Sequence, residues 1–136
     1  MSFVLDASAT FAWAFSDKAF VSALPALDSV QRTFAEAPVL WQFEVASAIR
    51  KATREARISH QQTESFLALI STLDIRTQHE PPTIPRLLDL AVHYNLSTYD
   101  ATYLDLAIRL QIPLATLDHD LAEAAHMAGV EILLKA

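Results

Sequence analysis

The chain has 136 residues, of which 52% are hydrophobic and 19% charged, a composition that fits a folded domain and excludes a disordered protein. It contains no cysteine, which excludes disulfides, zinc–thiolate sites and thiol nucleophiles. The formal net charge of −6 argues against unspecific coating of nucleic acid. No apolar run is long enough to span a bilayer. We therefore expect residues 1–136 to form a single domain of a cytoplasmic protein without a membrane segment.

The hydrophobic pattern predicts helices and strands that alternate along the chain. Ser59 and Gln62 have the spacing of a capping box, and the only glycine, Gly129, marks a stop. In chain order, we expect a strand at 3–5, a helix around 11–15, a helix at 19–32, a strand at 33–36, helices at 41–57 and 60–72, a strand at 73–77, helices at 85–94 and 97–110, a strand at 114–117, a helix at 119–128 and a strand at 130–134. This alternation favours an α/β sandwich around a mostly parallel sheet.

Four acidic residues stand where these elements begin or end. Asp6 and Asp118 directly follow predicted strands, and Glu44 lies in the first turn of the helix after strand 33–36. Asp100 lies at the start of a helix that a short link joins to strand 114–117, so the helix and the strand run antiparallel. Because the two have similar lengths, the start of the helix lies level with the end of the strand. Because ligands bind at the carboxyl edge of a parallel sheet, we expect the four carboxylates to converge there.

Each of these residues alone also fits an ordinary helix N-terminus, where acidic side chains cap and meet the helix dipole. The repulsion among four converging negative charges, however, costs more free energy than four helix caps contribute, unless a cation or raised pKa values relieve it. An oxygen-only ligand set without thiolates selects Mg²⁺ or Mn²⁺. Such an ion activates water for attack on a phosphodiester. A nearly glycine-free chain also excludes glycine-rich phosphate loops.

Four segments in this order resemble PIN-domain nucleases, and most closely the VapC-type ribonuclease toxins of type II toxin–antitoxin pairs. The segments are Val4-Leu5-Asp6-Ala7-Ser8, Trp41-x-x-Glu44-Val45, Leu96-Ser97-Thr98-Tyr99-Asp100-Ala101-x-Tyr103-Leu104 and Leu114-Ala115-Thr116-Leu117-Asp118.

The resemblance implies a PIN-like three-layer α/β/α sandwich with a central, mostly parallel five-stranded sheet, and Mg²⁺-dependent endoribonuclease activity. It also implies a homodimer and a cognate antitoxin whose tail occupies the active-site groove. By position, Asp6, Glu44, Asp100 and Asp118 match the acidic, metal-binding cluster. Thr116 and Ser8 match supporting positions, whereas the role of Asp120 stays open.

Basic residues gather on the helix that carries Glu44. Arg50, Lys51 and Arg54 project from the side opposite its apolar face, with Arg57 beyond them, and Lys51 lies about 10 Å along the axis from Glu44. They are candidates for guiding an RNA backbone; a solvated surface, with Glu55 interspersed, is the alternative. His119 is expected to be an exposed first-turn residue, and Asp105 to face solvent.

Other functions remain open at this level. A housekeeping RNA-processing nuclease and a non-catalytic RNA-binding or scaffold domain fit the same fold. A haloacid-dehalogenase-type phosphatase needs a second aspartate two residues after the first, where this chain has Ser8. A metal-free ribonuclease needs an acid–base histidine pair, and the histidines offer none.

Overall fold

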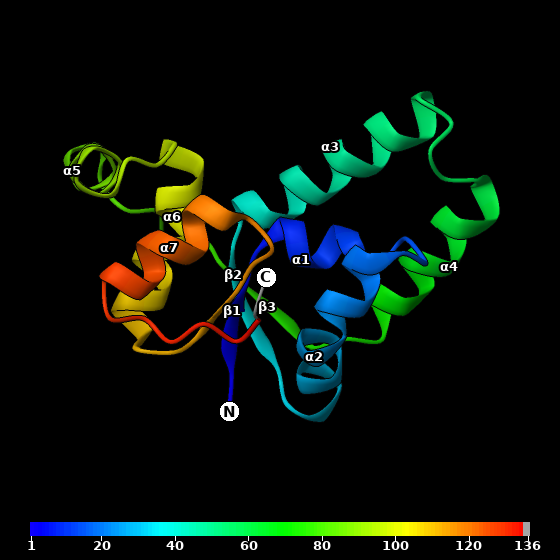
Figure 1. Cartoon of the computed structure of the whole chain (residues 1–136), viewed down its shortest axis with the longest axis horizontal. Coiled ribbons are helices and arrows are strands. Elements are labelled where there is room, and N and C mark those ends of the chain that lie inside the picture. Colours follow the sequence, from blue (N-terminus) through cyan, green and yellow to red (C-terminus); the bar gives the residue numbers. More distant parts are fainter. Residues whose placement is uncertain (135–136) are drawn as a thin grey trace.

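The structure, a computed structural model, describes residues 1–134. Four parallel strands form its sheet in the spatial order β3-β2-β1-β4. The strands are β1 (Phe3–Leu5), β2 (Ala35–Pro38), β3 (Ile75–Gln78) and β4 (Leu114–Ala115). Because all four point the same way, their carboxyl ends share one edge, at the top of Figure 1.

Helices cover both faces of this sheet, which confirms the predicted three-layer α/β/α sandwich. Figure 1 shows the first four helices on one side of the strands and the last three on the other. They are α1 (Ala7–Ala12), α2 (Lys18–Arg32), α3 (Leu40–Arg54), α4 (His60–Ser71), α5 (Ile84–Tyr94), α6 (Thr98–Leu110) and α7 (His119–Met127). The capping box predicted at Ser59 and Gln62 is present, with both hydrogen bonds formed.

The core is centred on β1 and α6. All three residues of β1 are buried, as are Leu114 and Ala115 of the neighbouring β4. From α6, Tyr103 and Leu104 are fully buried among them. A strand that is apolar at every position requires cover on both faces, which is the situation of an inner strand in a parallel sheet. No helix of residues 1–134 is long and apolar enough to cross a membrane.

The expected fifth strand, 130–134, does not form. The segment makes a single parallel bridge between Leu114 and Ile132, with two backbone hydrogen bonds to Leu114. The physical reason lies in β4, which has two residues rather than the four expected at 114–117. Beyond Thr116, the N–H groups of Leu117 and Asp118 donate to the hydroxyls of Ser8 and Thr116 instead. They are therefore lost to sheet pairing, and the partner strand has little to extend along.

Two other strands begin two residues later than predicted. The strand expected at 33–36 is β2, because Thr33 donates both its N–H and its hydroxyl to the carbonyl of Ser29 and so closes helix α2. The strand expected at 73–77 is β3, because the N–H of Leu73 still bonds to the end of α4. Helix α3 begins at Leu40, which places Glu44 in its second turn rather than its first.

Asp105 was expected to face solvent, and that expectation is wrong. Its side chain is only 1% exposed and accepts hydrogen bonds from Arg86 Nε of α5 at 3.1 Å and from Arg109 Nε of α6 at 2.7 Å. Helix α5 packs across this side of α6 and buries it. A buried carboxylate with two guanidinium partners is the arrangement that desolvation demands, and it fixes α5 to the helix that carries Asp100.

Candidate active site

Asp6, at the carboxyl end of β1, is held by two hydroxyl groups. Its Oδ2 accepts from Ser8 Oγ at 2.6 Å and from Thr116 Oγ1 at 2.6 Å. Each hydroxyl oxygen in turn accepts a backbone N–H, Ser8 from Leu117 and Thr116 from Asp118. Each hydroxyl has one proton, so this pattern directs both protons at the carboxylate. The Asp6 side chain, 4% exposed, is therefore fixed in orientation.

The backbone of Asp6 is fixed from the opposite side as well. Its carbonyl accepts from Thr10 Oγ1 at 3.0 Å, and that hydroxyl accepts from Trp41 Nε1 at 2.9 Å. The chain of bonds joins α1 to the start of α3. Trp41 and Trp13 are both buried, 7% and 4% exposed, and both belong to the hydrophobic core.

Glu44 reaches the same region from the second turn of α3. Its Oε1 accepts a hydrogen bond from the hydroxyl of Tyr103 at 2.7 Å. Tyr103 lies on α6 and is 0% exposed, so its hydroxyl needs a partner inside the protein. The contact connects α3 to α6 across the end of the sheet.

Asp100 and Asp118 belong to the first turns of α6 and α7. Ser97 caps α6 by accepting from the N–H of Asp100 at 3.1 Å. Asp118 caps α7, because its Oδ1 accepts from the N–H of Leu121 at 3.0 Å. The structural explanation considered for Asp118 therefore holds for one of its oxygens. Both side chains are half-buried.

The pKa values indicate that the four carboxylates share one electrostatic environment. The pKa of Asp100 is raised to about 6, by burial first and then by the charges of Asp118, Asp6 and Glu44. Burial also raises the pKa of Asp6, helped by the charge of Asp118 and opposed by the Ser8 and Thr116 hydroxyls. The pKa of Glu44 is raised by burial and by Asp6, and lowered by Tyr103. Four elements thus bring mutually repelling charges to one edge.

This donor set fits a hard divalent cation by its chemistry. All the candidate ligands are carboxylates, and a cation would relieve the repulsion that raises their pKa values. Within residues 1–134, no three or more His, Asp or Glu side chains lie close enough together to hold a metal ion as they stand. Mg²⁺ does not require such a cluster, because it keeps several waters and commonly uses one or two carboxylates. Asp6, Glu44, Asp100 and Asp118 are the residues that could hold such an ion.

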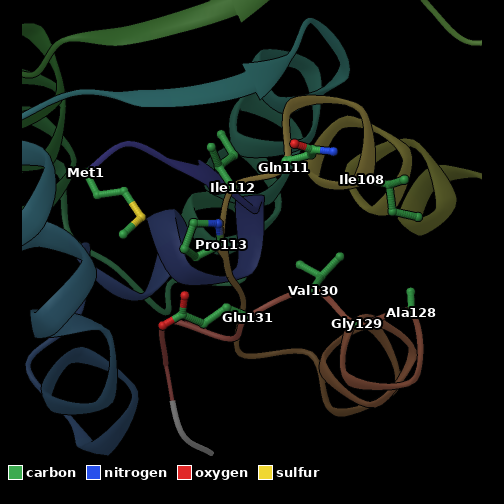
Figure 2. Close-up of a pocket in the computed structure, with 9 residues that line it drawn as sticks. All are labelled: Met1, Ile108, Gln111, Ile112, Pro113, Ala128, Gly129, Val130 and Glu131. Carbon is green, nitrogen blue, oxygen red and sulfur yellow. The ribbon is translucent and has the colours of Figure 1, made fainter.

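A pocket lies at the amino-terminal edge of the sheet, opposite the four carboxylates. Figure 2 shows it formed by Met1, which precedes β1, by Pro113, which precedes β4, and by the segment around Val130. The one acidic side chain among its lining residues is Glu131. A single carboxylate in such a setting offers no acid–base pair and no ligand set, so the chemistry of the molecule concentrates at the carboxyl edge.

The basic residues predicted as an RNA guide lie on the exposed part of α3. Arg50, Lys51 and Arg54 line a shallow surface depression with Ser47 and Glu55. Arg57 differs, because its guanidinium lies 5.5 Å from the ring centre of Phe15 and 3.9 Å from Glu55. Figure 1 shows α3 extending well beyond the sheet. The three side chains therefore lie outside the core, further along α3 than Glu44.

His119 and Asp120, whose roles stayed open, both lie on the surface of α7. The His119 side chain is 82% exposed, and its Nε2 is 3.8 Å from Glu123, as expected for an exposed first-turn histidine. Asp120 lines a groove with His93, Tyr94 and Asn95.

Tyr103 and Thr10 were not assigned a role from the sequence. Tyr103 had one available signal, since a tyrosine among buried helix positions needs a hydrogen-bond partner. Its partner is 59 residues away, which no local pattern shows. Thr10 gave no signal, because its two bonds depend on how α1 and α3 pack.

The fold and the four carboxylates place the protein in one structural class, the three-layer α/β domains with an acidic site at the carboxyl ends of the strands. Comparison with known proteins gives the family. A model of the PIN domain family matches residues 3–127. Ribonuclease VapC1 from two strains of Mycobacterium tuberculosis is 36% identical over 96 residues, which are 70% of this chain and 71% of the relative.

A solved structure agrees in fold. The crystal structure of PAE2754 from Pyrobaculum aerophilum superimposes with a TM-score of 0.64, covering 91% of this chain and 87% of that one, at 22% identity. The chain belongs to the PIN-domain family, and within it to the VapC type. The resemblance inferred from the sequence motifs is thereby confirmed.

Replacing Asp100 tests the electrostatic description. A carboxyl group whose pKa is raised on folding holds its proton more tightly in the folded state. The contribution of Asp100 to the free energy of unfolding is therefore greatest at low pH and is lost as pH rises from about 4 to about 6. Without divalent metal, Asp100→Asn should therefore melt at a higher temperature than the native chain at pH 8. The difference should shrink towards pH 4.

Thermal melts in EDTA, followed by circular dichroism across this pH range, measure the effect. Asp89→Asn makes the same charge change on the exposed part of α5 and should shift the melting temperature little. An Asp100→Asn protein that is less stable than the native chain at pH 8 would contradict the repulsion.

Proposed function

We propose that this protein is a Mg²⁺-dependent endoribonuclease, with Mn²⁺ as an alternative ion, that hydrolyses phosphodiester bonds of RNA. The observation that carries the proposal is the convergence of Asp6, Glu44, Asp100 and Asp118 from four elements on one edge, where burial and mutual repulsion raise the pKa values of three of them. The similarity to Ribonuclease VapC1 supports RNA as the substrate.

In the proposed reaction, the oxygen of a water molecule attacks phosphorus and the bond from phosphorus to O3′ breaks. One fragment keeps a 5′-phosphate, and the other leaves with a 3′-hydroxyl after its oxygen takes up a proton. A bound divalent ion supplies the activation of water and the neutralisation of charge at phosphorus. The four carboxylates hold that ion, and Asp6 and Asp100 are its firmest ligands in this proposal.

The chain's own contribution is to fix the ligands before the substrate arrives. Ser8 and Thr116 hold Asp6 Oδ2 in one orientation. Tyr103 holds Glu44 and favours its charged form, since its hydrogen bond lowers the pKa of that group. Rigid support of this kind around ligands typically matters by 10–100-fold in metal affinity or activity.

Arg50, Lys51 and Arg54 are proposed to contact the RNA backbone. Their exposure and clustering on α3 support this, because phosphate contacts position a nucleic acid without reading its sequence. The net charge of −6 makes a local basic surface the means by which such a chain attracts RNA.

We further propose that the protein is the cytoplasmic toxin of a toxin–antitoxin pair and acts as a homodimer. The VapC-type similarity supports the pairing. An exposed apolar face on α5, formed by Ile84, Leu88 and Val92 at 75%, 52% and 81% exposure, supports self-association, since such faces are uncommon on monomers. Light scattering tests the dimer, and growth arrest relieved by co-expression of the neighbouring gene's product tests the pairing.

The decisive experiment measures RNA cleavage by purified protein with Mg²⁺ and identifies the new ends by sequencing. We expect 5′-phosphate ends, complete loss of cleavage in EDTA, and a loss of more than about 100-fold in Asp6→Asn, as befits a direct ligand. Asp89→Asn is the matched control. Cleavage that persists in EDTA, or that yields cyclic 2′,3′-phosphates, rules out the proposed mechanism.

The Tyr103→Phe substitution isolates the hydrogen bond to Glu44. It removes one hydroxyl from a buried ring, so the fold should be kept while Mn²⁺ affinity, measured by titration calorimetry, and cleavage both fall about 10-fold. Tyr94→Phe removes a hydroxyl that makes no hydrogen bond to the described residues and should change neither. Equal effects of the two substitutions would mean that Tyr103 acts through packing alone.

The basic residues are tested by salt dependence. Replacing Arg50, Lys51 and Arg54 together with alanine should raise KM for RNA, leave kcat nearly unchanged, and reduce the slope of log affinity against log salt by about 2 for a single strand. A double substitution of Lys18 and Arg32 to alanine on α2 removes two positive charges away from α3 and should change the slope little. An unchanged salt slope would identify Arg50, Lys51 and Arg54 as a solvated surface.

A further inference from the structure

A cavity opens at the same edge of the sheet as the four carboxylates. Pro38 ends β2, Gln78 ends β3, and both line it together with Thr98 and Tyr99 from the first turn of α6. Tyr99 is joined directly to Asp100. The cavity measures about 230 Å³ and lies on the β2–β3 side of the proposed active site. Tyr99 therefore links the lining of the cavity to Asp100 of the proposed active site along the chain.

The lining of this cavity suits an uncharged group. Its lining is mostly apolar and includes Leu40, Leu87 and Leu106. Two charged residues also line it, and one of them, Arg109, is already bonded to the buried Asp105 at 2.7 Å. The other is Glu80, which forms no ion pair within residues 1–134. An apolar cavity with an acidic residue in its lining disfavours a phosphate.

Tyr99 presents an aromatic ring at this place. Its side chain is 62% exposed, whereas Tyr103, one helical turn further, is fully buried. Single-stranded RNA is commonly bound by stacking its unpaired bases on aromatic side chains. The cavity is also smaller than the roughly 300–1,000 Å³ of pockets that enclose drug-sized ligands, which suits a single planar ring system.

We propose that this cavity binds one unpaired nucleobase of the RNA substrate, stacked on Tyr99, next to the phosphodiester held at the carboxylates. The proposal rests on the proposed function, since it needs RNA to lie across this edge. Adjacent Cα atoms are about 3.8 Å apart, so a phosphate at Asp100 has its own base within reach of Tyr99. The cavity then selects single-stranded segments, because a paired base cannot enter it.

The experiment uses single-stranded RNA oligonucleotides that carry the fluorescent base 2-aminopurine at successive positions, with binding measured in Ca²⁺ instead of Mg²⁺, so that the carboxylates can still hold a cation beside the phosphate. With the native chain we expect strong quenching at one position. Tyr99→Ala should abolish this quenching and weaken binding about 5- to 150-fold, the range for one stacked base. Tyr99→Phe should retain both, and the exposed Met127→Ala on α7 is the surface control.

A second measurement removes the base instead of the ring. An RNA that is abasic at the quenched position should lose affinity for the native chain and lose little more for Tyr99→Ala, because the two changes delete the same contact. Additive losses, or quenching that persists in Tyr99→Ala, would overturn the proposal. So would a Tyr99→Ala chain that changes its oligomeric state but not its RNA binding, which would make the cavity a protein interface.

The two proposals fail differently. If RNA binds with the expected quenching but is not cut with Mg²⁺, the endoribonuclease activity is refuted and the base site stands. If RNA is cut by both the native chain and Tyr99→Ala with equal KM, the base site is refuted and the activity stands.

Discussion

The fold and the site both depend on one carboxylate oxygen, Oδ2 of Asp6. The two hydroxyls that bond to it come from residues two and 110 positions away in the chain. The same hydroxyls receive the N–H groups of Leu117 and Asp118. The end of β1, the start of α1 and the loop before α7 are thereby tied at one point. Strand β4 stops after two residues because its continuation is used for this purpose, and Asp118 is turned towards the edge.

The carboxylates at this edge are unfavourable for folding when no cation is present. Burial and like charges raise the pKa values of Asp6, Glu44 and Asp100, which means that their charged forms are destabilised in the folded chain. The core offsets this cost through β1 and the buried side of α6. Sites that perform chemistry are commonly less stable than the scaffold that holds them, and the position of these charges on the rim of a dense core follows that pattern.

The parts of this structure that sequence reasoning predicted well are those that local patterns determine. Asp6 and Asp118 follow buried strands, so their shared edge follows from parallel pairing alone. The capping box at Ser59 and Gln62 is likewise a local signal. Glu44 does lie near Asp6, but its predicted placement rested on a strand that begins two residues later and on a first turn that is the second turn of α3. The length match used for Asp100 assumed a strand at 114–117, where only two residues form β4.

What could not be predicted depends on contacts between distant residues. The burial of Asp105 needs α5 to pack across α6, and a helical wheel for α6 alone leaves that side facing water. The bond between Tyr103 and Glu44 joins residues 59 positions apart. The missing fifth strand results from side-chain hydroxyls competing for backbone N–H groups, which no propensity scale for strands includes. Each case is a tertiary interaction that changes a local preference.

Helix α3 sets the spacing between Glu44 and the three basic residues Arg50, Lys51 and Arg54. It carries Glu44 near the sheet and the three basic residues further along one continuous helix of 15 residues, and Figure 1 shows it projecting past the body of the domain. Seven residues of α-helix separate Glu44 from Lys51, a rise of about 10 Å. That spacing is set by the helix itself and not by any loop. Helix α3 therefore fixes the distance between its three basic residues and the acidic edge, independently of any loop.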